Sequence, residues 1–117
     1  MHNFKKLDIW YKSVELVADI YRLVNIFPQI ERFGLVSQMQ RAAVSIPTNI
    51  AEGSAKSSDK DFARFLEISL GSAYELETEL LVAFKLSYIE SEIYDQFQKK
   101  ISELQRMING FKGTLIV

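Results

Sequence analysis

Apolar residues recur at intervals of three and four through four successive segments, and this periodicity constrains the fold more than any other feature. Such spacing places the apolar side chains on one face of an α-helix. Strand patterns are weak, and only five glycines and two prolines interrupt the chain. The pattern predicts helices over about residues 8–26, 32–55, 59–84 and 90–112.

The connections between these segments are short, roughly three to six residues, and short connections make consecutive helices antiparallel neighbours. The sequence therefore predicts an all-α, antiparallel, up-down-up-down four-helix bundle. The 117 residues fit one domain spanning residues 1–117, and the 48% hydrophobic content supplies a core without a disulfide or metal.

The second helix carries a proline inside its periodic stretch, within the motif RAAVSIPTNIAEG from Arg41 to Gly53. An internal proline removes one backbone hydrogen bond and clashes one turn back, at a cost of about 3 kcal/mol. The second helix is therefore predicted to kink at Pro47. Gly53 and Gly113, near the predicted ends of the second and fourth helices, are expected to act as C-caps.

Glu77 lies near an apolar stripe of the third predicted helix, where an unpaired carboxylate costs several kcal/mol. Its expected partners are Asn49 or Arg41 on the kinked helix. Together with Glu52, these residues are predicted to form a structural polar network that fixes the helix register. Catalysis by Glu77 is the competing interpretation.

Sites for metals and for nucleophilic catalysis are not predicted. The single histidine is His2 and the chain has no cysteine, which argues against a di-iron or zinc centre. There is no Gly-x-Ser-x-Gly elbow and no glycine-rich phosphate loop. We therefore expect no catalytic residues, no metal ligands and no cofactor.

The formal net charge is −1, so non-specific binding to nucleic acid requires a local basic patch. The candidate contacts are Lys5, Lys6, Lys12 and Arg22, which a ring of identical subunits would gather into one surface. Ordinary solubilising charge is the competing interpretation. No run approaches about 18 apolar residues and no secretory signal is recognisable, so a cytoplasmic location without membrane contact is expected.

The motif at residues 41–53, the segment GSAYELETEL at residues 71–80 and the pattern FKKLDIWYKSVELVADIY at residues 4–21 resemble a known bacterial family. Its members are four-helix bundle proteins first noted as reading frames within 23S rRNA intervening sequences. The resemblance covers essentially the whole chain. It implies an antiparallel four-helix bundle that assembles as a homopentamer, in a family with no settled activity.

A related branch, the accessory variability determinants of diversity-generating retroelements, forms similar pentameric barrels that bind nucleic acid and a reverse transcriptase through a basic surface. The net charge of −1 departs from that pattern. The residues that match recurrent family positions are carried over as architectural residues: Arg41, Pro47, Asn49, Glu52, Gly53, Glu75 and Glu77.

Two functions follow from these observations. The first is a non-enzymatic, ring-forming interaction protein associated with ribosomal RNA or another nucleic acid. The alternative is a protein-binding oligomeric scaffold that binds no nucleic acid. An enzyme is the weakest interpretation, because no nucleophile, metal or acid–base set assembles. The expected partners are further copies of the chain, RNA or another protein.

Overall fold

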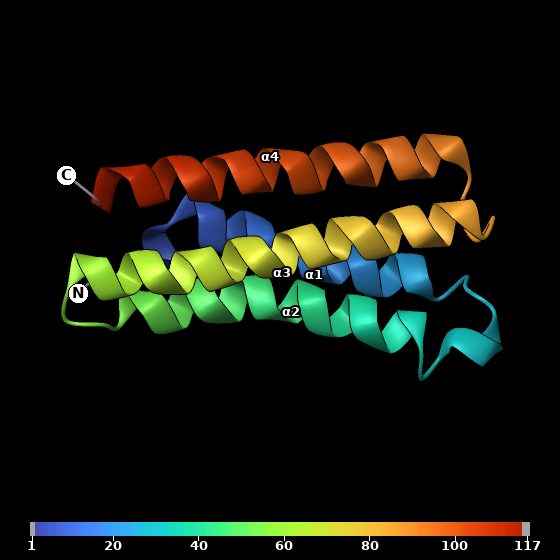
Figure 1. Cartoon of the computed structure of the whole chain (residues 1–117), viewed down its shortest axis with the longest axis horizontal. Helices are drawn as coiled ribbons and strands as arrows, with labels where there is room; N and C mark the ends of the chain where they lie inside the picture. The colour runs from blue at the N-terminus through green and yellow to red at the C-terminus, as the bar shows by residue number, and fades with distance from the viewer. Residues whose placement is uncertain (1, 116–117) are drawn as a thin grey trace.

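The computed structural model describes residues 2–115, and the chain in that range forms helices and no strands (Figure 1). The elements in chain order are η1 (Phe4–Lys6), α1 (Asp8–Val24), η2 (Gln29–Glu31), α2 (Leu35–Ser54), α3 (Asp59–Lys85) and α4 (Ser91–Leu115). The two η elements are short 3-10 turns. The predicted all-α fold with four helices is confirmed.

Contacts between α2 and α3 run in opposite sequence directions. Ser45 on α2 accepts a hydrogen bond from Ser72 on α3, and Gly53, farther along α2, lies against Phe62, which is earlier on α3. Figure 1 shows the α1–α2 and α3–α4 connections at one end of the bundle and the α2–α3 connection at the other. Consecutive helices therefore pack antiparallel, and the bundle is 44 Å along its longest axis.

Local side chains explain where α2 and α3 begin. The Ser58 Oγ accepts a hydrogen bond from the Asp61 N–H and thereby caps α3. The Glu31 Oε1 accepts one from the Leu35 N–H, so α2 begins at Leu35 and not at residue 32 as predicted. Glu31 Oε2 also accepts a 2.7 Å hydrogen bond from the Tyr88 hydroxyl, which ties the α1–α2 connection to the α3–α4 connection.

The core lies along the centre of the bundle and receives side chains from all four helices. Ile20, Met39, Leu76 and Ile108, one from each helix, have no exposed surface. Burying side chains of this size stabilises the folded state by roughly 1.5–3 kcal/mol each. The core thus joins the four amphipathic faces that the sequence pattern predicts.

The structure corrects the expected role of two glycines. Neither Gly53 nor Gly113 has a positive φ, so neither forms a left-handed cap. α4 continues through Gly113 to Leu115. α2 likewise continues through Pro47 without interruption, and the bend at this residue stays a prediction.

Gly53 instead permits a close approach of α2 to α3. A Cβ atom at this position would lie 2.7 Å from the Phe65 Cβ and 2.8 Å from the Phe62 Cδ1. Both distances are shorter than real Cβ contacts, so a larger residue would force the helices apart. Glycine is therefore required here by packing and not by backbone conformation.

Candidate interaction surfaces

Glu77 is half-buried at the seam between α3 and α4, where two side-chain amides bind it. Its Oε1 accepts a 2.7 Å hydrogen bond from Gln105 and its Oε2 accepts a 3.2 Å hydrogen bond from Gln98. The structure thus corrects the predicted partners, Arg41 and Asn49, because these lie on α2 whereas Glu77 faces α4. The sequence contains a signal for the observed partners: the two glutamines are seven residues apart, and this spacing places both on one face of α4.

The other three members of the predicted network lie along α2. The Asn49 amide donates to the carbonyl and the hydroxyl of Ser45 at 2.8 and 3.0 Å, and Ser72 of α3 donates to the same hydroxyl at 2.7 Å. Asn49 therefore supports the α2–α3 contact. Arg41 and Glu52 are exposed and line a surface hollow on α2. They make no side-chain hydrogen bond or ion pair within residues 2–115.

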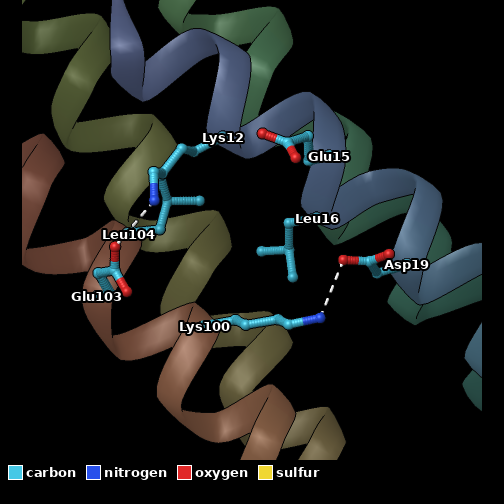
Figure 2. A pocket seen from close by; sticks show the side chains of 7 residues that line it. All are labelled: Lys12, Glu15, Leu16, Asp19, Lys100, Glu103 and Leu104. Carbon is cyan, nitrogen blue, oxygen red and sulfur yellow. Dashed lines mark hydrogen bonds and ion pairs between the residues drawn. The ribbon is translucent and has the colours of Figure 1, made fainter.

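A hollow between α1 and α4 is flanked by two ion pairs (Figure 2). The Lys12 Nζ lies 3.1 Å from the Glu103 Oε1, and the Lys100 Nζ lies 3.1 Å from the Asp19 Oδ2. The apolar side chain of Leu16 lies between the two pairs. Both lysines at this hollow are thus paired with carboxylates, which leaves little positive potential for an anionic ligand.

Arg22, another predicted nucleic-acid contact, is also paired within the protomer. Its Nη1 lies 3.2 Å from the Asp19 Oδ1. Arg22 is near the end of α1, whereas Lys5 and Lys6 precede its start. The four predicted contacts therefore do not form one basic patch on the protomer. Exposed ion pairs of this kind contribute at most about 1 kcal/mol.

One end of the bundle nevertheless gathers lysines from distant parts of the chain. The His2 N–H donates a 3.0 Å hydrogen bond to the Ser54 carbonyl, which holds the N-terminal segment against the end of α2. The α2–α3 connection and the start of α3 lie at the same end (Figure 1). Four lysines at this end make no ion pair within residues 2–115: Lys5, Lys6, Lys56 and Lys60.

Glu79 is a buried acid that the sequence analysis missed. Its side chain is 7% exposed, and its Oε1 has no hydrogen-bond partner among the described residues. Burial, and secondarily the carboxylate of Glu75, raise the pKa of Glu79 to about 7. The sequence places glutamates at 75, 77 and 79, and helical periodicity alone does not show which of them is most buried.

Large apolar side chains remain exposed on three of the four long helices. On α4 the exposed residues within residues 2–115 are polar or glycine. An apolar hollow between α1 and α2 adds to this surface, with Val14, Val44 and Pro47 among its lining residues. The exposed apolar and aromatic residues of α1, α2 and α3 are Tyr11, Val14, Tyr21, Val44, Ile68, Tyr74, Leu81 and Val82.

No group of three or more His, Cys, Asp or Glu side chains comes together in the described range to hold a metal ion. The helices of residues 2–115 include none with a stretch long and apolar enough to cross a membrane.

Comparison with known proteins gives a family and a fold. The family model described as 23S rRNA-intervening sequence protein matches residues 5–110. A crystal structure of a protein of unknown function from the S23 ribosomal protein family of Bacteroides thetaiotaomicron is similar, with a TM-score of 0.83 and 26% sequence identity. The match covers 90% of this chain and 95% of that one. No curated protein matches. The chain belongs to the family of 23S rRNA-intervening sequence proteins.

Proposed function

We propose that this protein is a non-enzymatic interaction protein that assembles into a ring of identical subunits, a homopentamer, in the cytoplasm. The observation that carries the proposal is the uneven distribution of exposed apolar side chains, which lie on α1, α2 and α3 but not on α4. Contiguous exposed apolar surface marks sites of protein interaction. The exposed face of α4 is thus suited to solvent, whereas the exposed faces of α1, α2 and α3 are suited to contact with a partner.

Identical subunits are the partner that best fits these surfaces. The apolar residues lie on different helices, so the surface on one side of the protomer differs from the surface on the other. Two different surfaces that bind each other form a head-to-tail interface, and such interfaces close into rings when the rotation permits. The expected number of subunits, five, comes from the resemblance of the sequence to the 23S rRNA-intervening sequence proteins.

Multi-angle light scattering on the purified chain tests this proposal. A pentamer has a mass of about 68 kDa, five times the 13.5 kDa protomer. Apolar contacts tolerate salt, so we expect the same particle mass in about 0.1 M and in about 1 M sodium chloride. A 13.5 kDa particle at tens of micromolar protein would overturn the proposal.

Association with nucleic acid is a second candidate function, favoured by the lysines that gather at one end of the bundle. Cyclic symmetry would repeat Lys5, Lys6, Lys56 and Lys60 around one rim of the ring. Fluorescence anisotropy with a labelled structured ribosomal RNA fragment tests this function. Binding should weaken steeply as salt rises, because counterion release dominates such binding.

Charge reversal gives this second test a matched control. Lys5→Glu should weaken RNA binding, whereas Lys99→Glu on the exposed face of α4, which changes the net charge by the same amount, should leave it near wild type. If the wild-type protein binds no RNA even at low salt, the nucleic-acid function is wrong. The protein-binding scaffold then remains as the function of the ring.

A further inference from the structure

We infer that the surface hollow at the α1–α2 connection binds a nucleotide, whose base stacks on the exposed ring of Phe33 and whose phosphate pairs with Arg32. The site does not depend on the ring assembly, because one protomer supplies the whole hollow. It lies at the opposite end of the bundle from the lysines that favour the second candidate function (Figure 1).

Phe33 presents an aromatic ring to solvent at a well-anchored point of the chain. The ring is 89% exposed, the largest exposed fraction of any large apolar side chain among the described residues. The preceding turn is closed by hydrogen bonds from the Glu31 N–H to the Pro28 carbonyl and from the Gly34 N–H to the Glu31 carbonyl. The Glu31 carboxylate holds the same turn to α2 and to Tyr88. The backbone that carries Phe33 is therefore fixed, while the ring stays open to a ligand.

Arg32 brings a positive charge to the same ring. Its Cζ lies 5.4 Å from the centre of the Phe33 ring, over one of the two faces. The guanidinium makes no ion pair within residues 2–115, whereas that of Arg22 is paired with Asp19. Aromatic rings and arginine guanidinium groups are the side chains on which unpaired bases stack. The charge of Arg32 is thus available to a phosphate beside a stacked base.

The hollow next to these two residues has the size and the polar groups of a small-molecule site. Its volume is about 570 Å³, within the roughly 300–1,000 Å³ of typical ligand pockets. The buried side chains of Val24 and Phe27 give it an apolar lining. Its other lining residues include three whose side-chain amides make no hydrogen bond within residues 2–115: Asn25, Gln29 and Gln40. Each amide offers both donors and an acceptor, as the edge of a base requires.

These groups together favour a nucleotide over other ligands. A fatty acid would use the apolar lining and Arg32 but would leave the three amides unpaired. An acidic peptide would pair with Arg32, but its charged side chains lack a flat ring to stack on Phe33. A nucleotide supplies a flat base, a polar base edge and a phosphate. The only charged residue that lines the hollow is Arg32, so the charge of the site complements that phosphate.

Saturation-transfer difference NMR with the four ribonucleoside monophosphates tests the site on the purified protein. Saturation should reach the base protons more strongly than the ribose protons, because the base lies against Phe33. Ribose phosphate, which has the phosphate but no base, should give a much weaker signal. Equal signals from ribose phosphate and the nucleotides would overturn the site, since charge alone would then explain binding. No signal from any of the four nucleotides would overturn it as well.

Two variants and two matched controls test the residues. Phe33→Leu keeps an apolar side chain but removes the ring, so it should weaken binding about fivefold or more, the lower end of base-stacking contributions. Arg32→Gln should weaken it roughly tenfold through the loss of charged hydrogen bonds. The controls Ile30→Ala and Arg22→Gln change exposed side chains that do not line the hollow, and they should bind as wild type does. All four changed side chains are exposed, so circular dichroism should show wild-type helicity. Equal losses in the variants and the controls would overturn the assignment.

Fluorescence anisotropy with a short, labelled single-stranded RNA distinguishes the two sources of a nucleotide. If Phe33→Leu weakens RNA binding, the hollow takes an unpaired nucleotide of RNA, and if RNA binding is unchanged, the ligand is a free nucleotide. The site and the lysine-rich end can fail separately. RNA binding that is lost in Lys5→Glu but unchanged in Phe33→Leu, without a signal from any monophosphate, would leave the lysine-rich end and overturn the hollow.

Discussion

Replacing Gly53 by alanine tests how closely α2 and α3 pack. The added methyl group would lie 2.7 Å from the Phe65 Cβ, an atom fixed to the α3 backbone, and 2.8 Å from the ring of Phe62, which is 1% exposed. Neither neighbour can move away by a simple side-chain rotation. The two helices must therefore separate by a few tenths of an ångström or more.

The expected cost combines two opposing terms. Overpacking a well-packed site costs about 1–3 kcal/mol, whereas alanine gains up to about 1 kcal/mol over glycine in helix propensity. Because the closest clash is with an atom fixed to the α3 backbone, the upper part of the overpacking range applies, and the net effect of Gly53→Ala is a loss of about 1–2 kcal/mol. For a chain of 117 residues this lowers Tm by roughly 4–8 °C.

Gly110→Ala is the matched control, because Gly110 is an exposed helical glycine with nothing within 4 Å of its missing Cβ. It should stabilise the protein by about 0.5–1 kcal/mol through helix propensity alone. Thermal unfolding followed by circular dichroism at one fixed protein concentration compares the three proteins. A Gly53→Ala variant that melts at or above the wild-type Tm would refute the packing argument.

Three other substitutions test other parts of the fold. Glu77→Ala leaves the amides of Gln98 and Gln105 without their acceptor and should cost about 1–2 kcal/mol; an unchanged urea midpoint would contradict this. The pKa of Glu79 is raised from 4.5 to about 7, so the folded state holds this proton more tightly than the unfolded state does. The free energy of unfolding of the wild type should therefore decrease as the pH rises from about 4.5 to about 7. Glu79→Gln should remove that loss and stabilise the protein by about 1–2 kcal/mol at pH 8. This gain is smaller than the roughly 3 kcal/mol of the full pKa shift, because the glutamine amide occupies the same buried position, where Oε1 has no hydrogen-bond partner among the described residues. Parallel pH–stability curves for the two proteins would disprove the prediction. Pro47→Ala should retain helicity but change the assembled mass or Tm, and a variant identical in both would show that the proline is dispensable.

The periodicity of apolar residues was sufficient to predict the number and approximate limits of the helices. For α3, the pattern and the Ser58 cap agree, so the predicted start at residue 59 is the observed one. The start of α2 was missed by three residues because it depends on a 3-10 turn and on the side chain of Glu31. Tertiary contacts of this kind leave no periodic signal in the sequence.

The partners of polar residues were less predictable than the helices. Periodicity shows that Glu77 lies near an apolar stripe, but α3 contacts α2 on one side and α4 on the other. The predicted partners of Glu77 lie on α2, whereas its observed partners lie on α4. The same limitation hid the burial of Glu79. Glycine near a helix end is equally ambiguous, since Gly53 fits both a left-handed cap and a close helix contact, and only the backbone angles distinguish them.

Cryo-electron microscopy of the purified wild-type protein tests the central claim, self-assembly into a closed ring, most directly. Class averages viewed down the symmetry axis should show five bundles around a channel. Single bundles about 44 Å long, two-fold dimers or open filaments would contradict the account.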